Sequence, residues 1–418
     1  MCREQRTSIK LFLILSLGSG KENDVMNEIR NNIFARKILL LGSKLLSLIN
    51  VIIPKNENKI LFYDSGRSFL DDNTEAIYTY LYNNGYAKKY KMICCVPNQK
   101  QDSPFRNYIP VGALKGVFAF LTSKYVFYSF GDFRIVPSSK QIVVNQWHGM
   151  PLKRIGKYAD DEKYQKENLD NFTYILATSE MFKSVMAKAF GSSTDKVAIL
   201  GETRVDYFFS DVDALSPFGI EREMYDKLVI WMPTFRQSID GRFQDGDKKS
   251  STLLPVFYTY ESLDALDDFL EKNNLLLVIK IHPMAVFKEH VFKRIIIMTN
   301  NDIVRKGIRP YEFLKEFDAL ITDYSSVYVD YLILNRPIIF TMDDEEEYKS
   351  SRGFIFDDIK ALMPGPFVKT EEEFKQCLKD VLQGHDSYSD KRIEINKKMN
   401  RYQKDHCKRL ADFVGLSI

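Results

Sequence analysis

Residues 319–341, ALITDYSSVYVDYLILNRPIIFT, contain a complete strand–helix–strand repeat. Ala319–Ile321 is an apolar strand, Ser326–Leu334 has a helical pattern, and Pro337–Thr341 is a second apolar strand. Apolar strands joined through a helix predict a βαβ unit and a parallel sheet. This segment therefore places the chain in the α/β class.

The same alternation extends outward and forms two series. A polar, acidic stretch near Ser210–Ser216 separates them and is followed by Pro217. We predict two Rossmann-like domains facing each other, at residues 56–216 and 217–390, with an N-terminal segment, 1–55, and a C-terminal helix, 391–418. In open parallel sheets, ligands bind at the carboxyl ends of the strands. The other predicted strands are Lys59–Tyr63, Lys91–Val96, Tyr125–Tyr128, Ile142–Trp147, Tyr174–Ala177, Val197–Leu200, Leu228–Trp231 and Leu276–Ile281.

The composition excludes several classes of protein. Among 418 residues, 45% are apolar and 28% are charged, and the net charge is +3, so neither disorder nor a nucleic-acid partner is indicated. No cysteine lies in a C-x-x-C pattern, which argues against a disulfide scaffold and a zinc ribbon. A reducing cytosolic location fits the five cysteines best.

Residues 29–56 predict a basic amphipathic helix. The segment has no acidic residue, and its run of apolar residues is interrupted by Lys44 and is shorter than the roughly 20 residues of a membrane-spanning helix. Such a helix suits an anionic membrane surface, which predicts a peripheral protein on the cytoplasmic face. A helix packed on its own domain is the alternative. The basic residues are Arg30, Arg36, Lys37, Lys44 and Lys55, and the apolar face is Phe34, Ile38, Leu41, Leu45, Leu48 and Ile52.

The first candidate for chemistry follows the predicted strand Ile142–Trp147. His148 precedes Gly149 in a loop, and an imidazole there can act as a general base near neutral pH. Lys153 and Arg154 can hold an anionic acceptor or a phosphate. A histidine that bonds only a loop carbonyl is the structural alternative.

Polar residues also follow strands in the second series. His282 and Pro283 end one strand, and Thr234 and Arg236 follow another. Arginine can hold phosphate oxygens with two parallel hydrogen bonds. Ser325 and Ser326 open a helix, where free N–H groups favour a phosphate, although ordinary capping needs no ligand.

In this order, the segments resemble the CDP-glycerol glycerophosphotransferase family of teichoic-acid and capsule synthesis. The resemblance covers roughly residues 45–385. It runs through DSG (64–66) with DN (72–73), WHGMPLKRIGKY (147–158), GETRVD (201–206), MPTFR (232–236), KIHP (280–283), ITDYSSVYVDY (321–331), NRPIIF (335–340), RGFIFD (352–357) and MPGPFV (363–368).

The resemblance implies a GT-B-like fold, with an N-terminal acceptor domain on the membrane and a C-terminal donor domain. It implies His148 and His282 as the essential pair. Lys153 and Arg154 are expected on the acceptor side, and donor or phosphate binding is expected from Arg236, Thr234, Ser325, Ser326, Asp323 and Arg352. The chain departs from the family pattern at Glu202 and Thr203, where a proline is more frequent, and at Met150, which could alter acceptor fit.

The expected activity is transfer of glycerol phosphate, or a related polyol phosphate, from CDP-glycerol to a hydroxyl of a polyol-phosphate or lipid-linked glycan acceptor, with release of CMP. No metal site is predicted and no cofactor is obligatory, although Mg²⁺ bound by the donor is compatible with the reaction. Three alternatives remain: CDP-ribitol as the donor, a GT-B glycosyltransferase that uses a nucleotide sugar, and a non-catalytic scaffold on a transferase fold.

Overall fold

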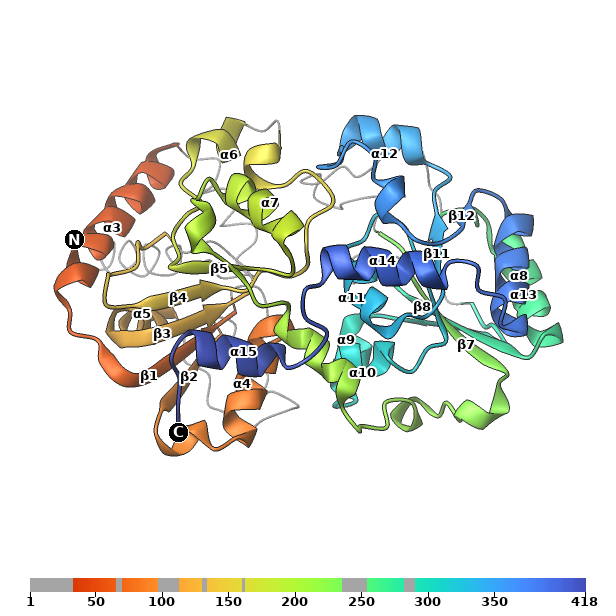
Figure 1. The fold of residues 1–418 in the computed structure, drawn as a ribbon, viewed down its shortest axis with the longest axis horizontal. Coiled ribbons are helices and arrows are strands. Elements are labelled where there is room, and N and C mark those ends of the chain that lie inside the picture. Colours follow the sequence, from red (N-terminus) through yellow and green to blue (C-terminus); the bar gives the residue numbers. More distant parts are fainter. Residues whose placement is uncertain are drawn as a thin grey trace. The chain divides into compact units, whose positions relative to one another are not determined.

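The computed structural model describes residues 33–64, 70–96, 113–129, 134–159, 162–234, 254–281 and 290–418. They pack into two compact units (Figure 1). The first comprises the described parts of Met1–His148, Ala159–Asp206 and Tyr402–Ile418, and the second comprises Gly149–Tyr158 with the described parts of Tyr207–Arg401. These units differ from the predicted division at residue 216 in three segments, 149–158, 207–216 and 402–418. The predicted domain boundaries themselves remain a prediction.

The first unit is built on a six-stranded sheet in the order β2-β1-β3-β4-β5-β6, and all neighbouring strands are parallel. Its inner strands are almost fully buried, as expected where helices cover both faces of a parallel sheet. The strands are β1 (Asn56–Tyr63), β2 (Lys91–Cys95), β3 (Ser123–Tyr128), β4 (Ile142–Asn145), β5 (Tyr174–Ala177) and β6 (Val197–Ile199), and the helices are α3 (Ile33–Ile52), α4 (Asp72–Asn83), α5 (Ala113–Thr122), α6 (Glu162–Lys166), α7 (Glu180–Phe190) and α15 (His406–Phe413).

The second unit has another six-stranded parallel sheet, in the order β12-β11-β10-β7-β8-β9. Trp231, Phe257 and Phe374 pack ring against ring within its core. The strands are β7 (Lys227–Met232), β8 (Leu275–Lys280), β9 (Ile295–Met298), β10 (Ala319–Thr322), β11 (Ile338–Thr341) and β12 (Phe367–Val368), and the helices are α8 (Tyr260–Lys272), α9 (Asn300–Arg305), α10 (Pro310–Leu314), α11 (Val327–Tyr331), α12 (Glu345–Ser351), α13 (Glu371–Gln383) and α14 (Ser389–Met399).

The strand–helix–strand repeat predicted at residues 319–341 is confirmed. Strands β10 and β11 pair in parallel, with Leu320 opposite Ile338, and α11 lies between them in the chain. The observed helix is shorter than the predicted one, because the α-helix ends at Tyr331 and a 3₁₀ turn continues to Leu334. Strands β9 and β12 were not predicted.

Helix α3 is confirmed as a helix, and its side chains are described from Leu41 onward. Its polar residues Ser43 and Asn50 are buried, and the Asn50 amide donates to Gln141 Oε1 at 2.7 Å. Its apolar residues Leu41, Leu45, Leu48, Val51 and Ile52 are exposed. The helix is therefore turned with its polar side toward the protein. No helix in the described parts of the chain is long and apolar enough to cross a membrane.

The C-terminal tail forms two helices, and the prediction of one helix in residues 391–418 is wrong. Helix α14 ends at Met399 in the second unit, and α15 begins at His406 and packs beside α4 of the first unit (Figure 1). Asp206 Oδ1 accepts from the His406 backbone N–H at 2.9 Å and lies 2.8 Å from His406 Nδ1, and Asp206 Oδ2 accepts from the Cys407 N–H at 2.8 Å. A carboxylate at a helix start satisfies donors that lack a partner within the helix.

Candidate functional site

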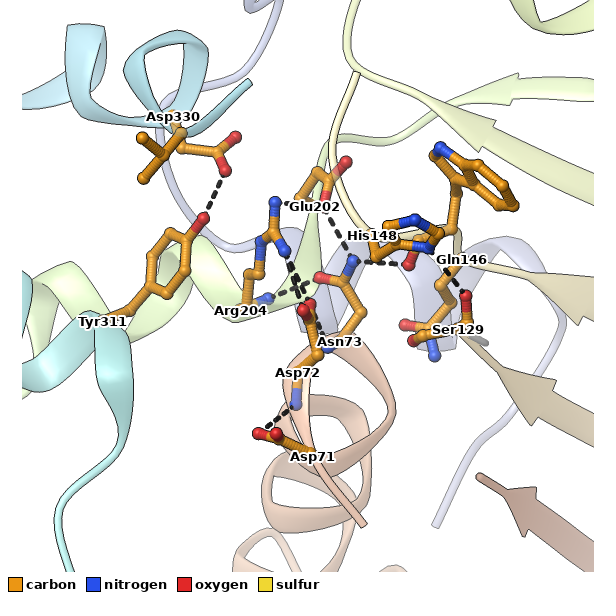
Figure 2. Close-up of polar contacts among 12 residues, drawn as sticks. Asp71, Asp72, Asn73, Ser129, Gln146, His148, Glu202, Arg204, Tyr311 and Asp330 are labelled. Atoms are coloured by element: carbon orange, nitrogen blue, oxygen red, sulfur yellow. Dashed lines mark hydrogen bonds and ion pairs between the residues drawn. The ribbon is translucent and has the colours of Figure 1, made fainter. Parts of the chain in front are cut away.

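His148 lies just beyond the carboxyl end of β4, as predicted, although the strand ends at Asn145 and not at Trp147. Its side chain is half-buried, and its ring lies 4.0 Å from the Trp147 ring between centroids. His148 Nδ1 lies 3.3 Å from the backbone carbonyl oxygen of Ser129, which follows the neighbouring strand β3 (Figure 2).

This contact determines the tautomer of the neutral ring. A carbonyl oxygen only accepts, so Nδ1 carries the hydrogen and the lone pair is left on Nε2. A neutral imidazole with its lone pair on Nε2 can remove a proton from a hydroxyl group. The structural alternative was a histidine that only bonds a loop carbonyl. The same contact fits both interpretations, because a carbonyl bonded to one ring nitrogen also orients a general base.

Around His148 lies a cluster of polar residues, largely buried, for which the sequence predicted no role. Arg204 Nη1 lies 2.9 and 2.8 Å from the two carboxylate oxygens of Asp72, and Arg204 Nη2 lies 3.2 Å from Glu202 Oε2. Asn73 connects Glu202 to the backbone of Trp147 (Figure 2). In the sequence, these residues stand out only as charged side chains beside apolar strands. Their contacts in the folded chain show that they form one cluster.

In the second unit, two predicted residues meet where adjacent strands end. Thr234 follows β7 and Asp323 follows β10, and the Thr234 N–H donates to Asp323 Oδ2 at 2.8 Å. The Thr234 hydroxyl also donates to Asp323. Asp323 is fully buried, so it holds the loop that carries Thr234 and is poorly placed to meet a phosphate itself.

Lys153 and Arg154 pack within the second unit. The Arg154 N–H donates to the Gly353 carbonyl at 3.2 Å, and an isolated antiparallel bridge joins Lys153 to Phe354. Lys153 Nζ lies 3.5 Å from Thr234 Oγ1 and 5.3 Å from the centre of the Tyr348 ring. The structure thus brings Lys153 to the residue that was predicted to bind the donor.

Gly353 explains part of the RGFIFD segment. Its φ is +72°, and a Cβ at this position would lie 3.0 Å from Arg154 Nε, so both the backbone conformation and the close approach favour glycine. Arg352 precedes it, and its backbone N–H donates to the Tyr348 carbonyl at 2.9 Å. The backbone of this segment is fixed on both sides, by Tyr348 and by Arg154.

Ser325 and Ser326 are half-buried at the start of α11. Ser325 Oγ accepts from the Val327 N–H at 3.5 Å, and Ser326 makes no side-chain capping bond. The helix has only five residues, so the argument for a phosphate there rests on the two hydroxyl groups and not on a long helix dipole. The predictions on Arg236 and His282 lie outside the described residues.

Two other chemistries lack support in the described parts of the chain. There, no group of three or more His, Cys, Asp or Glu residues could hold a metal ion. Burial raises the pKa of the Cys95 thiol to about 12 and raises that of Cys94 and Cys407 well above its ordinary value. A nucleophilic cysteine needs a lowered pKa, so these three are packing residues.

Comparison with known proteins gives relatives along nearly the whole chain. The teichoic acid poly(glycerol phosphate) polymerase of Bacillus subtilis (strain 168) is 25% identical in an alignment 409 positions long that covers 90% of this chain and 50% of that protein. The teichoic acid poly(ribitol-phosphate) polymerase of Bacillus spizizenii (strain ATCC 23059 / NRRL B-14472 / W23) is 26% identical in an alignment 350 positions long that covers 79% of this chain and 52% of that protein. The chain spans about half the length of these two relatives.

A solved structure of the wall teichoic acid polymerase TagF matches with a TM-score of 0.68 and 20% identity, over 94% of this chain and 96% of that one. The match confirms the predicted GT-B-like α/β fold. A family model described as CDP-glycerol:poly(glycerophosphate) glycerophosphotransferase matches residues 45–414. Because that model takes in most of the sequence, the chain belongs to the CDP-glycerol:poly(glycerophosphate) glycerophosphotransferase family.

Proposed function

We propose that this chain transfers glycerol phosphate from CDP-glycerol to a hydroxyl group of a polyol-phosphate or lipid-linked glycan acceptor, in teichoic-acid or capsule-type polymer synthesis. The acceptor oxygen forms a bond to the phosphorus that carries glycerol, and the bond from that phosphorus to CMP breaks. The observation that carries the proposal is His148, whose contact with the Ser129 carbonyl leaves Nε2 able to take the acceptor proton.

Phosphoryl transfer depends mainly on positioning and on neutralising charge on the phosphate oxygens. In this proposal, Lys153 supplies a positive charge to the donor phosphate, since its ammonium lies 3.5 Å from Thr234 Oγ1 at the carboxyl end of β7. The sequence suggested an acceptor-side role for Lys153 and Arg154, and this proposal differs from that prediction at Lys153 alone. Arg236 and His282 keep their predicted roles as partners of the pyrophosphate.

We also propose that the protein binds the cytoplasmic face of the membrane through α3. The exposed Leu41, Leu45 and Leu48 lie on the side of the helix away from the buried Asn50. An amphipathic helix with an unburied apolar face can enter the headgroup region of a bilayer. This position would bring a lipid-linked acceptor to the protein.

A donor assay tests the activity. Purified protein is incubated with a glycerol-phosphate acceptor and with CDP-glycerol, CDP-ribitol or a UDP-sugar, and the released nucleotide is identified. Release of CMP that requires the acceptor supports the proposal, whereas release of UDP from the sugar nucleotide identifies a glycosyltransferase. Because the ribitol-phosphate polymerase is as similar as the glycerol-phosphate polymerase, the ratio of rates with the two CDP-polyols assigns the donor. No turnover with any donor would favour the scaffold alternative.

A further inference from the structure

The residue before His148 has an unfavourable backbone conformation. Trp147 has a φ of +60°, in the left-handed region that bulky residues rarely adopt. Its N–H donates to Asn145 Oδ1 at 2.9 Å, and its ring packs against Phe190 with centroids 4.9 Å apart. Strained residues persist only where surrounding contacts hold them, and they occur frequently at functional sites. The contacts that hold Trp147 therefore also determine where His148 lies.

Asn73 makes the most direct of these contacts. Its side-chain nitrogen lies 3.1 Å from the Trp147 carbonyl oxygen and 2.7 Å from Glu202 Oε2, and the residue is fully buried. The Trp147 carbonyl belongs to the peptide group that joins Trp147 to His148. A donor on this oxygen restrains the plane of that peptide and hence the direction in which the His148 side chain leaves the backbone.

The orientation of the Asn73 amide follows from its neighbours. The Arg204 backbone N–H lies 2.9 Å from Asn73 Oδ1, and an N–H can only donate, so the oxygen of the amide faces Arg204. The NH₂ group must then face Glu202 and Trp147, which both offer acceptors. Each group of the amide has a fixed role, and rotation of the amide by 180° would place donor against donor.

Glu202 gives this arrangement its rigidity. Its carboxylate is fully buried, it accepts from Asn73, and it lies 3.2 Å from Arg204 Nη2. A carboxylate in such a position is held only if it is paired and hydrogen-bonded. Thr203 adds a contact on the other side of the loop, since its hydroxyl lies 2.8 Å from Gln146 Oε1.

We infer that Asn73, held in place by Glu202, is a positioning residue for His148 (Figure 2). Asn73 fixes the peptide that precedes His148, while the Ser129 carbonyl fixes its ring at Nδ1. Ser129 is itself held, since its hydroxyl lies 2.8 Å from the Thr74 hydroxyl. This inference rests on the proposed role of His148 as the general base.

The test separates the bond to Trp147 from the stability of the cluster. In the double variant Asn73→Asp with Glu202→Gln, the net charge is unchanged and the glutamine amide can donate to the new carboxylate. Glu202 Oε2 accepts from both Asn73 and Arg204, so the glutamine loses the contact with Arg204, and Asn73→Ser, which keeps Glu202, controls for that loss. The donor to the Trp147 carbonyl is lost. The matched control is Ser123→Ala, which removes another buried hydrogen bond of the same unit, from the Ser123 hydroxyl to the Ala119 carbonyl at 2.6 Å.

With CDP-glycerol as donor, we expect kcat of the double variant to fall about 10²-fold, because a displacement of about 1 Å at a reacting group can have this effect. KM for CDP-glycerol should change less than about threefold, since no donor-binding residue is altered, and Ser123→Ala should retain wild-type kcat. A folded double variant with wild-type kcat would overturn the inference. If the double variant does not fold, Asn73→Ser leaves Glu202 paired with Arg204 and gives the same comparison.

A second readout does not depend on turnover. The ¹⁵N resonances of the His148 ring report which nitrogen carries the hydrogen, and in the wild type we expect the Nδ1–H form. In the variant we expect a mixture of tautomers. An unchanged Nδ1–H signal in the variant would overturn the inference, whether or not the wild type releases CMP. If the wild type releases no CMP, only the proposed function is refuted.

Discussion

Substitution of two leucines on α3 tests membrane binding with a magnitude that follows from the structure. Leu45 and Leu48 are 58% and 69% exposed, so Leu45→Glu with Leu48→Glu removes little packing from the folded protein. Complete burial of a leucine side chain is favourable by about 1.5–3 kcal/mol, and these exposed fractions leave about 1–2 kcal/mol for each residue on entering a bilayer. The pair should therefore weaken binding by about 2–4 kcal/mol, or about 30- to 1,000-fold.

Co-sedimentation with vesicles of rising anionic phospholipid content measures this effect. The control is Met224→Glu with Val291→Glu, which introduces the same charge at exposed apolar residues of the second unit. We expect the control to bind like the wild type and the α3 variant to remain in the supernatant. Binding of the α3 variant within about threefold of the wild type would refute the reasoning, as would an equal loss in the control.

Among the basic residues of the N-terminal segment, Lys55 is held by contacts with the protein itself. Lys55 Nζ donates to the Asn50 carbonyl and to Asn50 Oδ1, each at 2.7 Å, and to the Leu121 carbonyl at 2.6 Å. Burial, followed by the nearby Lys140, lowers the pKa of Lys55. Its charge is directed into the protein, so deletion of residues 1–55 would also break these contacts. Substitution of the exposed leucines is the cleaner test.

Five further substitutions test the site and the C-terminal helix. His148→Ala and His282→Ala should each lower kcat about 10²-fold or more in a folded protein, and near-wild-type turnover would remove that residue from the mechanism. Arg236→Ala should raise the Kd for CDP-glycerol, measured by calorimetry, and an unchanged Kd would place it outside the donor site. Lys153→Ala should raise KM for CDP-glycerol more than KM for the acceptor, and the reverse would restore its acceptor-side role. Burial opposes ionisation of Asp206, but the hydrogen bonds from His406 and from two backbone N–H groups lower its pKa below the ordinary 3.8. The contribution of Asp206 to the stability of the fold is therefore present above pH 3.8 and is lost as the pH falls through the lowered pKa. Asp206→Ala should therefore destabilise the protein by about 3 kcal/mol at pH 7 and by less near pH 3, as measured by urea unfolding, and a loss independent of pH would contradict the ionic part of this account.

The sequence was sufficient for features that depend on local pattern. Alternating apolar strands and helices predicted both parallel sheets, and the position of His148 after a strand followed from the same pattern. The four-residue strand β9 was missed because short apolar runs resemble loop residues between longer elements. The tail was misread because its charged residues continue beyond Met399, where α14 ends, and no proline or glycine marks the break.

Features that depend on contacts distant in sequence were not predictable. Asn73 and Glu202 are 129 residues apart, and nothing in their local sequence shows that their side chains meet at 2.7 Å. The sequence also did not show that the polar side of α3 packs against the protein. Periodicity gives the two faces of a helix, but it does not say which face packs on the protein.

The segment WHGMPLKRIGKY shows why a continuous motif need not serve one domain. His148 packs in the first unit, and Lys153 packs in the second against the segment that holds Phe354. Between them, Gly149 has a φ of +123°, which a side chain would oppose, and Met150 is fully buried. The segment thus carries the proposed base in one unit and the proposed cation in the other. A substitution at Gly149 should accordingly lower kcat without removing any group that takes part in the chemistry.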